Sequence, residues 1–179
     1  KYLKKTFLVV YGDTIFDIDL RRFLKFHKGS KKDISLFVHP NDHPYDSDII
    51  ETDNKDNVIA LHPYPHKSKK YFNNLVNAAL YIIQKESLLK GPVNSKKIID
   101  FFRDLLPKLL QSGTKIIAYN SPEYIKDCGT PARLDQAIQD YKSGKIRKSN
   151  LSKPQYAIFI DRDGTLNVEV GHLSDEKKL

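Results

Sequence analysis

The chain has 179 residues, of which 40% are hydrophobic and 29% charged, and its net charge is +8. These proportions are ordinary for a globular domain, and no stretch approaches the roughly 20 apolar residues that a membrane-spanning helix needs. The single cysteine excludes an internal disulfide, so we expect a cytoplasmic protein without membrane contacts. The scattered lysine pairs permit anionic substrates, and we expect no nucleic acid partner.

The first half of the chain alternates apolar runs with polar connections. Residues 6–14, TFLVVYGDT, predict a strand covered on both faces. Residues 19–29 predict a short amphipathic helix. Its apolar side comprises Leu20, Phe23, Leu24 and His27. Further strands are expected at residues 33–40, 57–62 and 74–83, the last because it is rich in β-prone side chains.

The second half continues the alternation of helix and strand. Residues 95–113 predict a helix that Pro107 breaks or kinks, and residues 115–120 predict a strand. Residues 129–145 predict a helix that Thr130 caps. This helix is expected to bury Leu134, Ala137, Ile138 and Tyr141. Residues 155–160, QYAIFI, predict a last strand. The pattern favours an α/β fold with a mainly parallel sheet flanked by helices.

Two acidic side chains follow that last apolar run. In YAIFIDRDGTLN, Asp161 and Asp163 lie two residues apart, which places both carboxylates on one side of an extended strand. Paired carboxylates suit a magnesium ion, and one of them can act as a phosphoryl-accepting nucleophile. An ordinary exit from a strand into a turn would also use Asp and Gly.

The string FIDRDGTLN resembles the first motif of haloacid-dehalogenase-type phosphatases, in particular the branch that acts on heptose bisphosphate. This resemblance covers residues 156–179. It implies that Asp161 is the nucleophile, that Asp163 protonates the leaving alcohol and activates water, and that both help to hold Mg²⁺. Thr165 would add a substrate-binding hydroxyl. The later motifs of that family have no counterpart, so we expect no phosphatase activity from this segment unaided.

Two further aspartates, Asp13 in VVYGDT and Asp127 in YIKDCGTP, resemble the magnesium ligands of sugar-phosphate nucleotidyltransferases. Each alone is a normal residue before a turn or near a helix start. The resemblance runs from about residue 6 to about residue 143. It implies a Rossmann-like domain in which a sugar 1-phosphate attacks a nucleoside triphosphate. Magnesium would neutralise the charge that develops on the phosphate oxygens.

Some substrate contacts follow from the same resemblance. Asn77 would contact the sugar, as the Asn of the family's N-A-G-x-Y segment does, but Ala79 replaces its Gly and narrows the space. The family's Glu-Lys-Pro segment is not recognisable here. Lys67 is the candidate for its phosphate-contacting lysine. The glycine-rich loop that grips the triphosphate is expected before residue 1, and the chain contains no methionine, so we expect a piece that is open at both ends.

The overall hypothesis is part of a bifunctional enzyme of nucleotide-sugar biosynthesis. Residues 1–144 would form the C-terminal two-thirds of a nucleotidyltransferase domain, residues 145–154 a linker, and residues 155–179 the start of a phosphatase domain. The substrates would be a nucleoside triphosphate and heptose bisphosphate or heptose 1-phosphate. Two alternatives stay open, namely an active phosphatase with a non-catalytic transferase scaffold, and a basic α/β domain that binds nucleic acid.

Four histidines and the cysteine invite other interpretations. Histidines 39, 43, 62 and 66 lie in proline-rich loops, which disfavours a helical zinc site, and only one cysteine is available to help. They are expected to line a sugar pocket or to be exposed. Cys128 adjoins Asp127, which raises the pKa of its thiol and disfavours a nucleophilic role.

Overall fold

The computed structural model describes residues 3–66, 71–91, 99–168 and 171. Its centre is a six-stranded sheet with the order β5-β4-β6-β3-β7, in which β1 also pairs with β6. The strands are β1 (Thr6–Val10), β3 (Ile34–His39), β4 (Ile49–Thr52), β5 (Val58–His62), β6 (Val76–Gln84) and β7 (Ile116–Asn120). A separate antiparallel pair consists of β2 (Thr14–Asp17) and β8 (Tyr124–Asp127).

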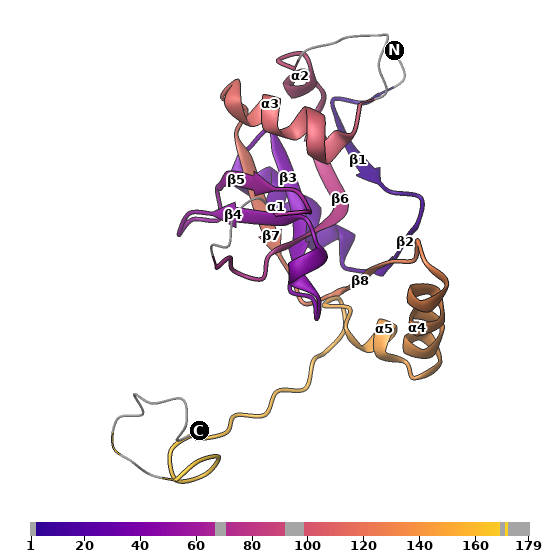
Figure 1. Cartoon of the computed structure of the whole chain (residues 1–179), viewed down its shortest axis with the longest axis vertical. Coiled ribbons are helices and arrows are strands. Elements are labelled where there is room, and N and C mark those ends of the chain that lie inside the picture. The colour runs from indigo at the N-terminus through magenta and orange to yellow at the C-terminus, as the bar shows by residue number, and fades with distance from the viewer. Residues whose placement is uncertain (1–2, 67–70, 92–98, 169–170, 172–179) are drawn as a thin grey trace.

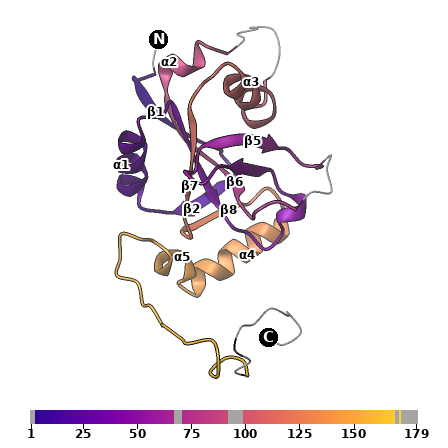
Figure 2. The ribbon, with the colours of Figure 1, turned by 90° about the vertical axis from the view of Figure 1, so that its left-hand side faces the viewer.

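Helices cover both faces of the sheet (Figures 1 and 2). The longer ones are α1 (Leu20–Ser30), α3 (Leu106–Gln111) and α4 (Pro131–Lys142). The short ones are α2 (Lys85–Leu88), α5 (Lys145–Lys148), a 3-10 turn η1 (Pro44–Asp46) and a π-turn η2 (Phe101–Leu105). No helix within the described ranges is long and apolar enough to cross a membrane.

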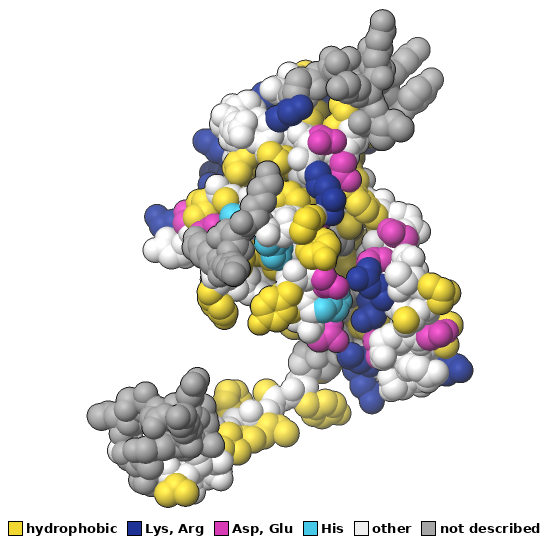
Figure 3. Space-filling model, in the orientation of Figure 1, with side chains coloured by type: hydrophobic (Ala, Val, Ile, Leu, Met, Phe, Trp, Pro, Cys, Tyr) yellow, Lys and Arg dark blue, Asp and Glu magenta, His cyan; other side chains and the backbone are white. Residues whose placement is uncertain are grey.

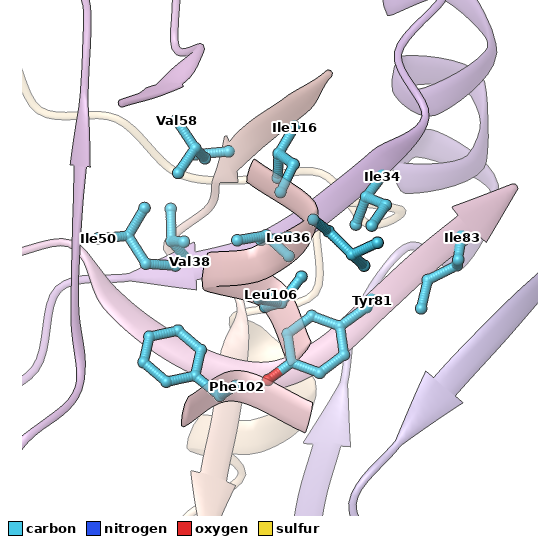
Figure 4. Packing of buried hydrophobic residues seen from close by; sticks show 12 residues of the cluster. Ile34, Leu36, Val38, Ile50, Val58, Tyr81, Ile83, Phe102, Leu106 and Ile116 are labelled. Atoms are coloured by element: carbon cyan, nitrogen blue, oxygen red, sulfur yellow. The ribbon is translucent and has the colours of Figure 1, made fainter. Parts of the chain in front are cut away.

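The alternation of side chains along the strands divides the core into two layers. On one face Leu36, Tyr81 and Leu106 converge under α3, as Figure 4 shows. On the other face Phe37 packs with Phe23 of α1 and with Tyr119. Successive residues of a strand point to opposite faces, so both faces of β3 and β6 are buried. This explains why their sequences are continuous apolar runs.

The sheet is mixed, so the expectation of a mainly parallel sheet was wrong. Among the described strands only β3 and β7 pair in parallel, and β6 is antiparallel to β1, β3 and β4. In the sequence the β4–β5 hairpin comes between β3 and β6. It returns the chain to the end where β3 finished, so that β6 pairs directly with β3 and His39 lies opposite Val76. An apolar run does not reveal the direction of a buried strand, because both directions bury the same side chains.

The expected strands at residues 33–40, 57–62, 74–83 and 115–120 are confirmed, whereas β2, β4 and β8 were missed. Each missed strand has four residues with polar members, which leaves little periodicity to detect. The strand β1 is covered on one face only, contrary to expectation, because Leu8 and Val10 are exposed at its edge position. In α1, Phe23 and His27 are buried as expected, but Leu20 and Leu24 are exposed.

Helix α4 begins as expected, with the Thr130 hydroxyl accepting a hydrogen bond from the Arg133 backbone N–H. Its packing differs from the expectation, because Leu134, Ile138 and Tyr141 are exposed and only Ala137 and Asp140 are buried. Helix α4 packs on β8 and α5 instead of on the main sheet, and therefore only a narrow face of the helix is covered.

The expected helix at residues 95–113 is confirmed only from Phe101, and residues 95–98 lie outside the described ranges. Asp100 caps the π-turn η2, because its carboxylate accepts the backbone N–H of Arg103. Pro107 lies in the first turn of α3, where its missing N–H leaves no helical bond unmade. The sequence pattern thus predicted the helix, but it did not predict that the turn before Pro107 is a π-turn instead of α-helix.

The expected linker at residues 145–154 packs on the body over its first half. Ile146 of α5 and Asn150 are both buried. The Asn150 amide donates to the Asp17 carboxylate, and the backbone N–H of Leu151 donates to Oε1 of Glu123 at 3.0 Å. Glu123 also accepts the Asp19 N–H at 2.6 Å, so this buried carboxylate joins three segments.

The expected strand at residues 155–160 does not form within the described chain. Its backbone is extended but joins no ladder, and Tyr156, Ile158 and Phe159 are 83–104% exposed. Figure 1 shows this segment leading away from the body. A strand depends on hydrogen bonds from a neighbouring strand, and no described strand lies beside this one.

Candidate active site

A cleft of about 690 Å³ opens at the edge of the main sheet where β1 and β3 end and β6 begins. Its other wall comes from β8, α4 and α5. Three of the predicted metal or substrate ligands line it, namely Asp13, Asn77 and Asp127. Three further residues discussed from the sequence also line it, namely His39, His43 and Ala79. Figure 3 shows basic, acidic and histidine side chains gathered on the face beside α4 and α5. The cleft is therefore polar and of mixed charge.

The β2–β8 pair brings Asp13 and Asp127 together. Asp127 ends β8 directly opposite Thr14, the first residue of β2, and Asp13 immediately precedes Thr14. The Cys128 N–H donates to the Asp13 carbonyl at 2.7 Å, which extends the pairing beyond the strand. Residues 114 positions apart in the sequence thus become neighbours through a strand pair that the sequence pattern did not reveal.

Gly129 keeps the space between these two carboxylates open. A Cβ atom at Gly129 would lie 3.0 Å from Oδ1 of Asp127 and 3.5 Å from Oδ2 of Asp13. The Gly129 N–H donates to Oδ1 of Asp127 at 2.6 Å. Both carboxylates therefore face one small volume beside the glycine. Hard, negatively charged oxygens around a small volume fit Mg²⁺, and Asp13 and Asp127 are the residues that would hold it.

Arg133, in the first turn of α4, forms an ion pair with Oδ2 of Asp127. The two side chains are 36% and 48% exposed, so the pair contributes little to stability. The pair places a guanidinium group directly beside the candidate metal ligands. Sequence reasoning missed Arg133, because the contact between Arg133 and Asp127 depends on how the loop between them folds.

Asn77 is held in one orientation on the floor of the cleft. Its Oδ1 accepts hydrogen bonds from the Ala79 N–H at 3.3 Å and from the Tyr81 hydroxyl at 3.0 Å. Because a backbone N–H can only donate, the amide oxygen must point toward it, which leaves the Nδ2 group to donate elsewhere. Burial raises the pKa of Tyr81, so its hydroxyl stays protonated and keeps donating. This arrangement suits recognition of a sugar hydroxyl.

Ala79, the departure from the resembled family, has a φ of +54°. A left-handed conformation costs an L-residue about 1–2 kcal/mol, whereas glycine adopts it freely. We therefore expect Ala79→Gly to raise the free energy of unfolding by about 1 kcal/mol, as measured by urea denaturation. Ala78→Gly is the matched control. It removes a methyl group from an ordinary buried strand position and should lower stability by about the same amount. Equal losses in both variants would contradict the interpretation.

The connection between β3 and β4 forms a rim of the cleft. Of the two expectations for His43, a place lining a pocket is the one observed, whereas Asn41 and Ser47 were not singled out from the sequence. Asn41 bonds the Asn74 side chain twice, at 3.1 Å and 2.6 Å, which fixes the rim to the segment before β6. The Ser47 hydroxyl accepts from the Asn41 amide at 2.8 Å, and His43 bonds Asp46 at 2.8 Å. The density of polar residues in HPNDHPYDSD was the available signal. Such a hydrogen-bonded rim presents fixed donors and acceptors to the cleft.

His39 lies at the end of β3 inside the cleft. Burial lowers the pKa of its imidazole to about 4, and the positive charges of His43 and Lys126 add smaller contributions in the same direction. The folded protein therefore holds His39 neutral, while the unfolded chain binds a proton below its ordinary pKa of 6.5. Between pH 6.5 and 4 the unfolded state binds more protons, so stability falls as the pH falls.

We expect the free energy of unfolding to drop by up to about 3 kcal/mol between pH 6.5 and pH 4 through His39. Urea denaturation across that pH range should show a shallower slope in His39→Gln than in the unchanged protein. The depressed pKa of the buried His27 contributes a remaining slope in both. Identical slopes would assign the whole effect to other groups.

The candidate residues of the C-terminal segment lie outside the cleft. Asp161 and Asp163 precede an exposed turn at residues 164–166 that contains Thr165, and the Asp163 backbone bridges to Asn167 across it. None of the three candidate residues lines the cleft. The Arg162 guanidinium bonds both carboxylate oxygens of Asp163, at 2.8 Å and 2.9 Å, and lowers the pKa of that carboxyl. Asp161 and Asp163 do not lie on one strand face as expected, because no strand forms here. Lys67 lies outside the described residues.

The histidine loops and Cys128 can now be placed. His62 Nε2 bonds Glu51 at 2.8 Å, and His66 Nε2 bonds the Ser47 carbonyl at 2.8 Å. Among the described residues no group of three or more His, Cys, Asp or Glu side chains is arranged to hold a metal ion. Burial first and Asp127 second raise the pKa of the Cys128 thiol, which confirms the expected direction.

Two carboxylates beside a large polar cleft at the edge of a mixed α/β sheet have the chemistry to bind a divalent cation and a phosphorylated ligand. A family model described as "Nucleotidyl transferase" matches residues 1–144. The chain therefore belongs to the nucleotidyl transferase family. The domain named by the sequence resemblance is confirmed at this level.

Individual relatives agree with this assignment. Glucose-1-phosphate adenylyltransferase of Clostridium novyi (strain NT) is 32% identical over 171 residues, which cover 86% of this chain and 44% of that protein. The enzyme of the same name from Bacillus cytotoxicus is 32% identical over 146 residues, or 78% and 38% of the two chains. The chain thus spans less than half the length of these curated relatives.

Solved structures show the same fold. HddC from Yersinia pseudotuberculosis superposes with a TM-score of 0.61 at 20% identity, over 77% of this chain and 56% of that one. HddC is also known in a complex with GMP-PN. A putative glucose-1-phosphate thymidylyltransferase from Bacillus anthracis, in complex with a sucrose, gives a TM-score of 0.60 at 16% identity, over 83% and 57%.

Proposed function

We propose that the whole protein is a Mg²⁺-dependent sugar 1-phosphate nucleotidyltransferase. The observation that carries the proposal is the apposition of Asp13 and Asp127 around Gly129, at the mouth of a cleft that also contains Asn77. The phosphate oxygen of the sugar would form a bond to the α-phosphorus of a nucleoside triphosphate. The bond between the α- and β-phosphates would break, and pyrophosphate would leave.

A few residues at the cleft would have defined tasks in this reaction. Bound magnesium would supply charge neutralisation on the phosphate oxygens. Asp13 and Asp127, fixed at the start of β2 and the end of β8, would hold it, and Gly129 keeps its volume open. Asn77, oriented by Ala79 and Tyr81, would donate a hydrogen bond to the sugar. Such fixed positions let the two substrates meet in an orientation suitable for in-line attack.

The relatives support a sugar 1-phosphate acceptor, because the curated ones are named glucose-1-phosphate adenylyltransferases. They do not support a particular base. The names of the relatives and fold neighbours include adenylyl and thymidylyl transfer, and one fold neighbour binds GMP-PN. We therefore propose the class of the acceptor, a sugar 1-phosphate, and expect an assay to identify the preferred nucleotide.

We further propose that residues 155–179 begin a second, phosphatase domain, with residues 145–154 as the connection. The string FIDRDGTLN supports this proposal. Its turn is formed even in the exposed segment, since Gly164 has a φ of +75° and its N–H donates to the Asn167 carbonyl at 2.9 Å. A phosphatase acting on heptose 1,7-bisphosphate would leave heptose 1-phosphate, which is an acceptor of the kind that the transferase requires.

The test uses protein expressed from its complete reading frame. Each of the common nucleoside triphosphates is supplied with heptose 1-phosphate or glucose 1-phosphate, and nucleotide-sugar is measured by liquid chromatography. We expect Mg²⁺-dependent product with one preferred nucleotide and no product with EDTA. Phosphate release from heptose bisphosphate without any nucleotide-sugar would favour the scaffold alternative. Micromolar, salt-sensitive binding to unrelated DNA together with neither activity would favour the nucleic-acid alternative.

A further inference from the structure

Resting on this proposed function, we infer that Arg133 is the residue that binds the phosphate of the sugar 1-phosphate. Lys67, the lysine that the sequence resemblance suggests for this contact, lies outside the described residues, so the comparison is made among the cations that the structure describes. Four cationic side chains line the cleft within the described residues, namely Arg103, Lys126, Arg133 and Lys145. Ion pairs distinguish Arg103, Arg133 and Lys145 from one another. Lys126 acts on His39 at the end of β3, where its charge helps to lower the pKa of the imidazole.

Arg103 and Lys145 belong to parts of the cleft away from the aspartate pair. Arg103 of η2 lies 3.6 Å from the Asp48 carboxylate in the rim opposite α4. Lys145 of α5 lies 3.6 Å from Asp140, which is buried and also accepts a hydrogen bond from Tyr124. Each of these two cations therefore pairs with a carboxylate other than Asp13 or Asp127.

Arg133 is directed to the aspartate pair itself. Its NH1 group donates to Oδ2 of Asp127, while the other oxygen of that carboxylate accepts the Gly129 N–H. A guanidinium group has five N–H donors in a rigid plane, so donors remain for a second anion beside Asp127. A phosphate bound beside Asp13 and Asp127 would meet those donors, because Arg133 already contacts Asp127. The planar fork of the guanidinium also matches two phosphate oxygens at once.

The same position predicts opposite effects on the two ligands. Arg133 attracts phosphate, but its positive charge repels a metal ion at Asp127 and competes for Oδ2. Removing the charge should therefore weaken binding of the sugar phosphate and tighten binding of the metal. A variant that merely damages the fold would weaken both, so the sign of the two changes separates a direct role from a structural one.

The experiment compares Arg133→Gln with Arg147→Gln in the full-length protein. Arg147 is the matched control, because it is exposed on the neighbouring α5 and does not line the cleft. For Arg133→Gln we expect the KM for sugar 1-phosphate to rise tenfold to a hundredfold, about the worth of a lost charge-assisted hydrogen bond. The KM for the nucleotide should change less than threefold. Arg133→Lys should restore part of the loss.

Metal binding provides a readout that does not depend on turnover. The affinity for Mn²⁺, measured by electron paramagnetic resonance, should increase severalfold in Arg133→Gln and stay unchanged in Arg147→Gln. An unchanged KM for the sugar phosphate in Arg133→Gln would overturn the inference about Arg133. It would leave the proposed function standing, provided that the parent protein is active. A larger rise in Lys126→Gln or Lys145→Gln than in Arg133→Gln would overturn it as well. If the parent protein transferred no nucleotide, the proposed function itself would fail.

Discussion

Replacing Asp127 by Asn should reduce nucleotidyl transfer about a thousandfold or more, which corresponds to roughly 4 kcal/mol of lost transition-state stabilisation. The substitution keeps the shape of the side chain and the acceptor for the Gly129 N–H, but it removes the charge that would fix magnesium. The measurement is the rate of nucleotide-sugar formation by the full-length protein at saturating substrate over a range of Mg²⁺ concentrations. Asp13→Asn should behave alike.

Two controls make this result specific. Asp135→Asn removes the same charge from an exposed position of α4 that does not line the cleft, and it should leave the rate unchanged. The free energy of unfolding of Asp127→Asn should change by less than about 1 kcal/mol, because the Asp127–Arg133 pair is largely exposed. Because Asp13 and Asp127 would act as a unit, the double variant should be hardly worse than either single one. Transfer within threefold of the parent protein in Asp127→Asn would favour a scaffold role for this domain.

Replacing Asp161 by Asn should abolish phosphate release from heptose bisphosphate, with a loss of a thousandfold or more, and should leave nucleotidyl transfer unchanged. An amide cannot serve as the nucleophile that accepts the phosphoryl group. The two activities should separate because Asp161 lies in an extended segment outside the cleft. The measurements are phosphate release and nucleotide-sugar formation on the same preparation of the full-length protein.

Asp163→Asn should also lose phosphate release, because the proposed acid and base would be missing. In the structure the Arg162 guanidinium holds the pKa of this carboxyl low, which favours the ionised form that activates water and disfavours the protonated form that donates to the leaving alcohol. The Asp135→Asn variant again serves as the control with the same change of charge. Full phosphate release by Asp161→Asn would refute the assignment of the nucleophile, and full release by both variants would refute the phosphatase proposal.

The central strands of the sheet were predictable because burial on both faces makes a strand continuously apolar, as in ISLFV of β3 and ALYII of β6. The C-terminal segment 155–160 has the same signature, yet it forms no strand among the described residues. An apolar run states that a segment would be buried, whereas a ladder also depends on a neighbouring strand. The same holds for helix α4, in which Leu134 and Ile138 are exposed. Helical periodicity predicts which side chains share a face, but it does not predict which element packs against that face.

For the candidate site, the resemblance to a known family named Asp13, Asn77 and Asp127, whereas residue types alone would have left each aspartate an ordinary turn residue. Arg133, Gly129 and, apart from His43, the Asn41–Ser47 rim entered only with the structure. Their roles depend on the β2–β8 pair and on the return of the chain before β6, which are contacts between distant segments. No local pattern encodes such contacts, because the short strands involved have too few residues for a periodic signal.

The sequence by itself determined the chemistry that is available: oxygen ligands for a hard cation, an amide for a sugar, and a second pair of acids after residue 160. Only the tertiary structure decided which of these groups share a cleft. The physical reason is that side-chain chemistry is a local property, whereas proximity depends on strand pairing and burial over the whole chain. Here the antiparallel pairing of four-residue strands places Asp13 beside Asp127, and the first turn of α4 adds Arg133 to them.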